Sequence, residues 1–455
     1  MTYDVIIRGG SVVLSDEQRV VDIGVRGETI AAIGEDLGDS ADLILDAAGL
    51  IVLPGLLDPH VHMGIPIKDT WSADDFTSGS VAAAFGGVTT LLDFSVQQPG
   101  QSLRQALNDR LARAHAQCHV DYGIHVNVTD QPLTHLDEIP GLIAEGFSSF
   151  KVFSTYREAG MMVTWPEFRA TLAQIDRHGG LLMLHAEDND LVETLTAQHL
   201  AAGQSAPIYH ARSRPAEAEA RAIEQAAAIA GDLGAQLYVV HVSSRLGLEA
   251  GLRARARGVN IFLETCPQYL ALDESRFLGE NGHWYIATPA LRTRADAEAL
   301  WAALAADEID AVGTDHCPFT RAQKDAHGGH FAFTPNGLPT VETRLPLLAT
   351  LGVAAGQITW AQLARVCATN PARLFGLAGR KGTLAVGQDA DVVLWDPAQE
   401  WVISAENQHG AADWSPYAGL TMSGKLVATL LRGQLIVQAD DFLGEEVWGR
   451  WLPAA

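Results

Sequence analysis

Short apolar runs alternate with longer segments of helical period over most of the chain, from about residue 51 to 375. This alternation is typical of repeated βα units around a parallel sheet. Because the count of such runs is eight, and eight units can close a sheet on itself, we expect an α/β fold of the (β/α)8 TIM-like barrel type. The predicted strands are 50–62, 88–94, 121–128, 147–153, 181–187, 237–243, 260–266 and 309–315.

Two of the intervening segments show the helical period clearly. In residues 102–117, Leu103, Leu107 and Leu111 recur at four-residue steps, as they do on the buried face of an amphipathic helix. Residues 216–231 are a run of strong helix formers. Both segments therefore favour helices that pack against the outside of a parallel sheet.

The two ends of the chain differ from its middle part. They carry short β-rich segments punctuated by glycine, at residues 5–13, 20–33, 390–395 and 425–438. Such strands can pair when the chain returns from the barrel to its starting point. We therefore expect residues 1–50 and 380–455 to form one small β-sandwich domain, beside a barrel domain of residues 51–379.

The charge of the chain argues against one class of partner. It has 31 Lys and Arg against 55 Asp and Glu, a formal net charge of −24. Nucleic-acid binding needs clustered basic residues, so we expect no nucleic-acid partner. No run of about 18 apolar residues occurs, and the start of the chain lacks a signal-peptide pattern, so we expect no membrane partner. The four cysteines have no metal-site or disulfide-scaffold spacing, and a cytoplasmic location is expected.

The most specific chemical signal is the motif Asp58-Pro-His60-Val-His62 at the end of the first predicted strand. Side chains two residues apart in a strand share a face, so His60 and His62 project together. Neutral imidazole is a common ligand of divalent transition metals. The motif therefore predicts a pair of metal ligands, with two partly buried structural histidines as the alternative.

Further candidates lie at the ends of later strands, where the catalytic groups of such barrels gather. His185 ends the run LLMLH, His241 ends LYVVH and Asp315 ends IDAVGTD. Lys151 lies in the apolar strand FSSFKVF, where burial penalises its charge. A neutral lysine can react with carbon dioxide to give an anionic carbamate that bridges two metals. The alternative is a lysine paired with a carboxylate inside the barrel.

These motifs resemble those of the amidohydrolase superfamily, and within it the cyclic amidases of the hydantoinase/dihydropyrimidinase group. The resemblance covers nearly the whole chain. It implies two divalent metal ions, usually zinc, with manganese or cobalt as alternatives, bridged by an N6-carboxylated lysine and a hydroxide. Carried over to this sequence, it implies one metal held by His60, His62 and Asp315, a second held by His185 and His241, and Lys151 as the bridging ligand.

The resemblance also implies a reaction. The bridging hydroxide attacks the carbonyl carbon of a cyclic amide, and the ring opens to an N-carbamoyl amino acid. Asp315 takes the proton of the nucleophile and returns it to the leaving ring nitrogen. Substrates of this kind are small hydantoins and 5,6-dihydropyrimidines, and the family usually forms homotetramers, so we expect a homotetramer or a homodimer.

Four further residues bear on which ring is opened. Tyr156 matches the tyrosine that hydantoinases use to stabilise an oxyanion, and allantoinases usually lack it. Thr288 and Asn336 match the positions that read the imide edge of the ring, although the family commonly has serine at the first. Gly64 stands where dihydroorotases have an arginine. The structural alternatives are a core aromatic for Tyr156 and a turn residue for Asn336.

The family contains other functions, which remain alternatives. Allantoinase, and less so dihydroorotase, would open other cyclic amides with the same metal ligands. A non-enzymatic scaffold of the collapsin response mediator type shares the fold but has lost metal ligands, and all six ligand positions are present in this chain.

Overall fold

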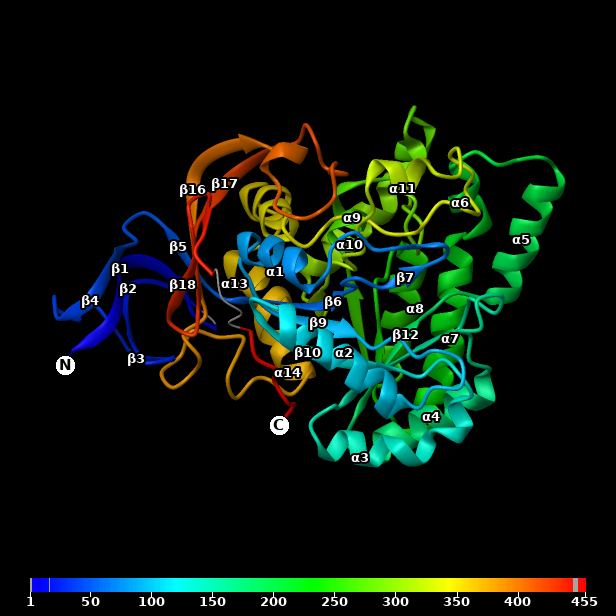
Figure 1. Ribbon diagram of the computed structural model, residues 1–455, viewed down its shortest axis with the longest axis horizontal. Helices are drawn as coiled ribbons and strands as arrows, with labels where there is room; N and C mark the ends of the chain where they lie inside the picture. The colour runs from blue at the N-terminus through cyan, green and yellow to red at the C-terminus, as the bar shows by residue number, and fades with distance from the viewer. Residues whose placement is uncertain (1, 16, 445–448) are drawn as a thin grey trace.

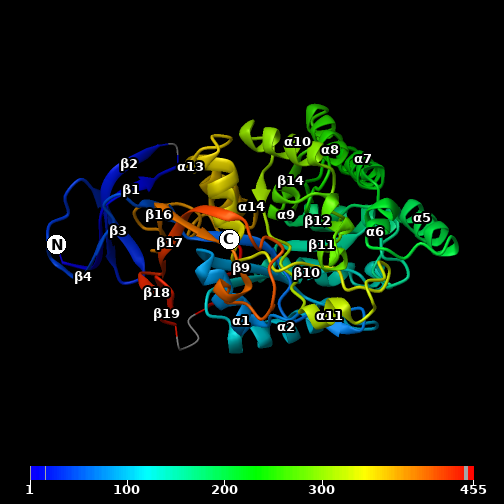
Figure 2. The same cartoon turned by 90° about the horizontal axis from the view of Figure 1, so that it is seen from above.

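The computed structural model describes residues 2–15, 17–444 and 449–455. It contains a parallel barrel and, beside it, a mixed sheet built from both ends of the chain (Figure 1). Seen from above, the mixed sheet lies at one end of the molecule and the barrel with its helices occupies the rest (Figure 2). The predicted α/β barrel with a small β domain from both chain ends is therefore confirmed.

The barrel has eight strands, which pair in parallel in the order β15-β14-β13-β12-β11-β10-β9-β6. The two outermost strands meet at an isolated bridge between Val61 and His316, where His62 N donates to His316 O at 2.8 Å. The ring of strands is thus nearly closed. Its members are β6 (Leu56–Val61), β9 (Val88–Phe94), β10 (Asp121–Asn127), β11 (Ser149–Phe153), β12 (Leu181–His185), β13 (Leu237–Val239), β14 (Ile261–Thr265) and β15 (Ala311–Val312).

Helices cover the outside of the barrel and begin at residues that cap them. Ser102 caps α2 with Gln105 in a capping box, and Thr164 caps α4 in the same way with Glu167. The principal helices are α1 (Phe76–Phe85), α2 (Leu103–Gln117), α3 (Ile139–Ala144), α4 (Trp165–Arg177), α5 (Asn189–Ala201), α6 (Ile208–Ser213), α7 (Ala216–Leu233), α8 (Arg245–Ala256), α9 (Pro267–Ala271), α10 (Arg294–Ala305), α11 (Arg321–Asp325), α12 (Arg344–Leu347), α13 (Trp360–Ala364) and α14 (Asn370–Leu374).

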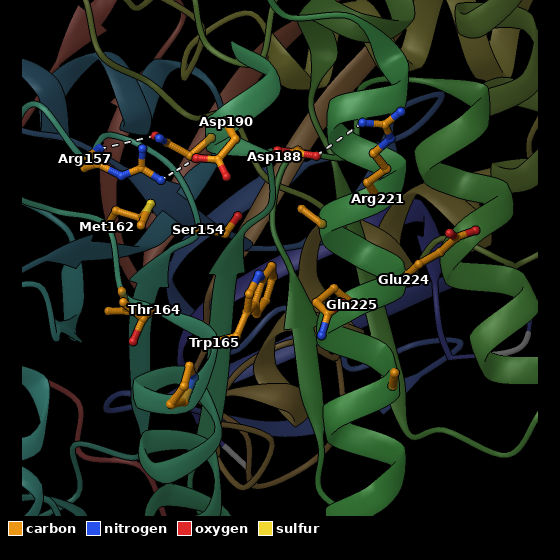
Figure 3. Close-up of a pocket in the computed structure, with 15 residues that line it drawn as sticks. Ser154, Arg157, Met162, Thr164, Trp165, Asp188, Asp190, Arg221, Glu224 and Gln225 are labelled. Carbon is orange, nitrogen blue, oxygen red and sulfur yellow. Dashed lines mark hydrogen bonds and ion pairs between the residues drawn. The ribbon is translucent and has the colours of Figure 1, made fainter. Parts of the chain in front are cut away.

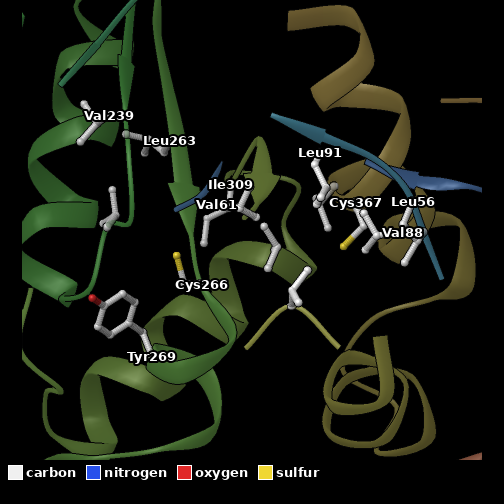
Figure 4. Packing of buried hydrophobic residues seen from close by; sticks show 14 of the residues in the cluster. Leu56, Val61, Val88, Leu91, Val239, Leu263, Cys266, Tyr269, Ile309 and Cys367 are labelled. Carbon is white, nitrogen blue, oxygen red and sulfur yellow. The ribbon is translucent and has the colours of Figure 1, made fainter. Parts of the chain in front are cut away.

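The barrel core is formed by the apolar runs themselves. Every residue of β9 and of β11 is buried, as expected for strands that are covered on both faces. Figure 4 shows part of this packing, with Leu56 and Val88 beside Cys367, and Val61 near Cys266 and Ile309. The continuous apolar runs that predicted the strands are thus a direct consequence of burial on both sides of the sheet.

The mixed sheet has nine strands. Residues of β5 and β16 alternate between two cores: Val52 and Leu394 belong to a small core of this sheet, whereas Leu53 and Val393 belong to the large core that includes the barrel. The sheet is therefore buried against the barrel on one face. Its strands are β1 (Tyr3–Val13), β2 (Gln18–Arg26), β3 (Thr29–Gly34), β4 (Ala41–Asp46), β5 (Ile51–Pro54), β16 (Val392–Val402), β17 (Thr421–Leu431), β18 (Gln434–Gln438) and β19 (Asp441–Phe442).

The first predicted strand, 50–62, is wrong as a single strand. It divides at Gly55 into β5, which pairs with β1 and β16 in the mixed sheet, and β6, which begins the barrel. The chain changes sheets where a side chain cannot fit, because a Cβ atom on Gly55 would lie 2.3 Å from Thr89 Oγ1. We keep 1–50 with 380–455, and 51–379, as proposed domain limits, although β5 lies within the second range and pairs in the mixed sheet.

None of the helices in the described residues is long and apolar enough to cross a membrane. A short hairpin of β7 (Pro66–Ile67) and β8 (Thr70–Trp71) follows β6 on the way to α1. This hairpin lies beside the site described next.

Candidate functional site

The six predicted metal ligands come from five different barrel strands. His60 lies in β6 and His62 directly after it, Lys151 lies in β11, and His185 is the last residue of β12. His241 and Asp315 follow β13 and β15. Because the strands are parallel, their C-terminal ends meet at one end of the barrel, and this is where the side chains converge.

Three of these residues form a compact group. Nε2 of His60 lies 3.2 Å, and Nε2 of His62 3.1 Å, from the same carboxylate oxygen, Oδ1 of Asp315. The potential ligand atoms of the three residues all lie within 4.8 Å of one another. Two imidazoles and a carboxylate at this spacing form a group that could hold a divalent metal ion.

The other two histidines extend this group. The ring of His241 stacks on that of His60 with the centroids 5.5 Å apart, and the ring of His185 meets His241 edge-on at 4.5 Å. Burial lowers the pKa of His185 and that of His241, so these imidazoles are neutral near pH 7. Neutral imidazole is the form that binds metal.

Lys151 joins the group from β11. Its Nζ lies 3.1 Å from Nε2 of His60 and above the ring of Phe94, 4.7 Å from the centroid. Burial lowers the pKa of Lys151 to about 8, against the opposing charges of Asp315 and Glu264. Within the part of the chain that the structure describes, no carboxylate forms an ion pair with Lys151. A fraction of the amine is therefore neutral near pH 7, and this is the form that reacts with carbon dioxide.

Two buried glutamates that sequence reasoning missed hold the histidines in place. Oε1 of Glu264 lies 2.8 Å from Nδ1 of His60, and Oε2 of Glu187 lies 2.7 Å from Nε2 of His185. Each contact leaves the second ring nitrogen of its histidine free as a ligand. Carboxylates that orient metal-bound histidines in this way are common around metal sites.

A third missed carboxylate supports the chain beyond His62. Asp93 Oδ2 accepts a hydrogen bond from Met63 N at 2.8 Å, and Arg110 Nε donates to Asp93 Oδ1 at 2.7 Å. The positions of these carboxylates in the sequence could have drawn attention to them. Asp93 and Glu264 lie near the ends of predicted strands, and Glu187 follows His185 at a two-residue spacing, but neither fact indicates a partner.

The fit of metal ions to this site can be judged from the donors themselves. Among the described residues, Nδ1 of His62 and Nδ1 of His241 are buried without a hydrogen-bond partner. Buried polar atoms without partners are rare in folded proteins and call for a ligand or another explanation. A convergent set of neutral imidazoles, a carboxylate and a desolvated lysine is chemically suited to borderline divalent ions such as zinc.

Tyr156 lies beside this group, after β11. Its ring centroid is 5.2 Å from that of His185, and the guanidinium of Arg214 lies over the ring at 5.3 Å. Burial raises the pKa of Tyr156 to about 12, although the charge of Arg214 opposes the shift. The phenol is therefore a hydrogen-bond donor at neutral pH. Arg214 is a further residue that sequence reasoning missed, and its Nη1 donates to Glu187 Oε2 at 2.5 Å.

Thr288 and Asn336 complete the predicted set. Thr288 lies beside the phenol of Tyr156, and its hydroxyl is buried without a partner of regular geometry among the described residues. The segment that carries Asn336 runs alongside, because Gly337 N donates to Ile286 O at 3.0 Å. The structure thus brings Tyr156 and Thr288 together and puts Asn336 on an adjoining segment.

The backbone at the site is strained. Among the described residues, eight other than glycine have a positive φ, and three of them are Tyr156 at 68°, His241 at 42° and Asp315 at 52°. This conformation disfavours residues that carry a Cβ atom, so it persists only where the surrounding structure imposes it. Strain of this kind concentrates at functional sites, in agreement with the convergence of these side chains.

A separate cavity of about 740 Å³ opens on the outside of the barrel (Figure 3). Ser154 and Thr164 from the loop after β11 line it together with Trp165 of α4 and Gln225 of α7. Arg157 reaches Asp190 across its upper edge in this view. None of the six predicted metal ligands lines this cavity, so it is distinct from the candidate site.

Comparison with known proteins gives a consistent result. A model described as the amidohydrolase family matches residues 51–436. The chain is 39% identical to a D-hydantoinase of Geobacillus stearothermophilus over 454 residues, which covers 99% of this chain and 96% of that protein. It is 40% identical to a D-hydantoinase of Ralstonia pickettii over 453 residues, covering 99% and 98%. The crystal structure of a dihydropyrimidinase from Brevibacillus agri is similar with a TM-score of 0.97, at 38% identity and coverage of 99% and 98%.

Proposed function

The chain belongs to the amidohydrolase family, and on this basis we propose that it is a metal-dependent hydrolase that opens hydantoins and 5,6-dihydropyrimidines to N-carbamoyl amino acids. The observation that carries the proposal is the convergence of His60, His62 and Asp315 at the C-terminal end of the barrel, with Lys151 at 3.1 Å from His60. Cyclic amide hydrolysis is the activity named for its full-length relatives.

The ligand set that we propose is the one that the family resemblance implies, and the spacing of His60, His62 and Asp315 supports its first part. His60, His62 and Asp315 would hold one divalent ion, His185 and His241 a second, and carboxylated Lys151 both. Zinc is the ion we propose, with manganese or cobalt as alternatives. When bound, such ions lower the pKa of a water molecule and polarise a carbonyl group.

The protein groups have separate tasks in this proposal. Oδ of Asp315 accepts the proton of the attacking water and returns it to the ring nitrogen that leaves. The phenol of Tyr156, which stays protonated near neutral pH, donates a hydrogen bond to the carbonyl oxygen as negative charge develops on it. Thr288 and Asn336 hold the opposite edge of the ring.

Tyr156 also favours this substrate class over the alternatives. Its phenol lies within the site, beside His185 and Thr288, which supports the role of an oxyanion donor. Allantoinases usually lack that donor, and Gly64 cannot read the carboxylate of a dihydroorotase substrate. We propose that the protein prefers the D-enantiomers of 5-substituted hydantoins, because the relatives named above are D-hydantoinases.

The test combines metal analysis with turnover. The purified protein is expected to contain close to two metal ions per chain and to open hydantoin and dihydrouracil, with products identified by mass. Removal of metal with dipicolinate should abolish turnover, and zinc, manganese or cobalt should restore it. Less than one ion per chain after preparation with metal present, or turnover of allantoin or dihydroorotate alone, would overturn the proposal. Light scattering would test the proposed homotetramer or homodimer.

A further inference from the structure

The segment between α6 and α7 brings an arginine, Arg214, to the candidate site. Arg214 is the residue that directly follows α6. Its guanidinium carbon lies 5.3 Å from the centroid of the Tyr156 ring, and its Nη1 donates to Glu187 Oε2 at 2.5 Å. Arg214 thus contacts the proposed oxyanion donor, although none of the tasks assigned so far involves it.

The position of Arg214 is fixed by contacts at both its side chain and its main chain. Glu187 is fully buried, and its Oε2 is shared between Arg214 and Nε2 of His185. Arg292 Nη1 donates to the main-chain carbonyl of Arg214, and Arg292 Nε donates to Ser243 Oγ at 3.0 Å. Arg214 is therefore anchored to the segments that follow β12 and β13, and its guanidinium is held in place before a substrate binds.

The ring of Tyr156 depends on such neighbours for its orientation. Its backbone is strained, with φ at 68°. Within the described residues, no hydrogen bond of regular geometry fixes the phenol. The ring is contacted by Phe153, with the centroids 6.0 Å apart, by His185 at 5.2 Å, and by the guanidinium of Arg214. Of these neighbours, Arg214 is the one that carries a permanent positive charge.

The charge of Arg214 suits the task proposed for Tyr156. A guanidinium over the face of an aromatic ring is attracted to it, and the attraction is stronger where water is excluded. The Arg214 side chain is 12% exposed, so most of this contact is shielded from solvent. The same positive charge lies close to the phenol that is proposed to donate to a developing oxyanion, where it is favourable.

We infer that Arg214 is a positioning residue of the hydrolysis, whose guanidinium, anchored by Glu187, holds the Tyr156 ring in the orientation from which the phenol donates to the oxyanion. The inference rests on the proposed function in that Tyr156 is taken as the oxyanion donor. Arg214 then acts on the transition state through the Tyr156 hydroxyl. Its removal should therefore lower kcat more than it raises KM.

A double-mutant cycle tests this route. In Arg214→Met, measured with metal in excess, kcat for dihydrouracil should fall about 10- to 30-fold, the scale of one desolvated cation–π contact, while KM changes less than about 3-fold. In the Tyr156→Phe background, the same substitution should lower kcat by less than about 3-fold, because the hydroxyl that Arg214 positions is absent. A purely structural role of Arg214 would cost the same factor in both backgrounds.

Arg214→Lys covers the case in which Arg214→Met fails to fold for lack of a cation beside Glu187. Lysine keeps the positive charge but lacks the planar group that stacks on an aromatic ring. With Tyr156 present, kcat of Arg214→Lys should fall about 3- to 10-fold. In the Tyr156→Phe background, the lysine should cause no further fall.

Arg212→Met is the matched control. The Arg212 guanidinium lies over the ring of Tyr209 at 5.1 Å, and Tyr209 packs against His199 of α5. This variant should keep the kcat and KM of the wild type. The inference is overturned by equal losses with and without the Tyr156 hydroxyl, by a loss of kcat that follows the metal content of the variant, or by kcat values close to wild type in both Arg214 variants.

The wild type separates this inference from the proposed function. Turnover of hydantoin or dihydrouracil together with additive losses in the cycle would overturn the role of Arg214 alone. A wild type that opens no cyclic amide would overturn the proposed function and the role of Arg214 with it.

Discussion

Oε1 of Glu264 lies 2.8 Å from Nδ1 of His60, and both side chains are fully buried. The contact assigns the two nitrogens of His60 to different partners, because Nε2 faces Asp315 and Lys151. Glu264 also accepts from the backbone N–H of His241 and from the Tyr238 hydroxyl. One carboxylate therefore orients ligands that come from two different strands.

The first prediction concerns this carboxylate. Glu264→Gln should weaken metal binding about 10- to 100-fold, since the ring of His60 loses its fixed orientation. The measurement is metal retention in competition with a chelator. Glu249→Gln, which changes an exposed carboxylate on α8, serves as the control and should retain metal like the wild type. Equal retention by both variants would argue against an orienting role.

The second prediction concerns Lys151. Lys151→Ala should lose most of the bound metal while the barrel stays folded, because the Lys151 side chain enters the site and the strand pairing of β11 uses only backbone atoms. Circular dichroism and metal analysis give the two readouts. In the wild type, exchange with 13C-bicarbonate should give a carbamate carbon signal that Lys151→Ala lacks. Retention of two ions by the variant would refute the bridging role.

The third prediction concerns Tyr156. Tyr156→Phe should lower kcat about 10²- to 10³-fold, the usual scale for one oxyanion donor, with a small effect on KM. Steady-state kinetics on dihydrouracil measures it. Tyr209→Phe, at a tyrosine that packs against Arg212, is the matched control and should keep its turnover. Near-normal activity of Tyr156→Phe would make this residue a packing aromatic.

The fourth prediction concerns Asp315. Asp315→Asn removes the proton acceptor but keeps the size of the side chain, so kcat should fall at least about 10²-fold with the protein folded. Thermal unfolding, followed by circular dichroism, checks the fold. Substantial turnover in this variant would mean that a group other than Asp315 carries the proton.

The fifth prediction concerns stability at the joint between barrel and mixed sheet. Lys381 Nζ lies 2.7 Å from Asp121 Oδ2 and 2.7 Å from Asp391 Oδ2, and all three residues are buried. Lys381→Met removes a buried cation from Asp391 and from Asp121, which keeps its pair with Arg432, and should cost about 3–5 kcal/mol in the free energy of unfolding. Lys425→Met breaks an exposed pair with Asp440 and should cost about 1 kcal/mol or less. Denaturant unfolding measures the free energy of unfolding of both variants. Similar losses in the two would contradict a stabilising role for the buried Lys381 cluster.

The sequence was most informative where a local period defined the structure. Strand runs with a histidine at their C-terminal ends predicted which side chains converge, because parallel strands bring those ends together. The sequence did not predict contacts between residues that lie far apart in the chain and belong to no repeating pattern. Arg214 reaches Tyr156, and Lys68 reaches Asn336, through loops whose course depends on packing. The division at Gly55 was missed for a related reason, since both sides of it are equally apolar.

The division of the chain at Gly55 into β5 and β6 has a consequence for engineering the protein. β5 ends at Pro54 and β6 begins at Leu56, so the strand that carries His60 starts one residue beyond a strand of the mixed sheet. An excised barrel starting at residue 51 would keep β5 but deprive it of its pairing with β1 and β16. The mixed sheet is thus not a removable accessory: it anchors the first ligand strand, and truncations or circular permutations should leave this junction intact.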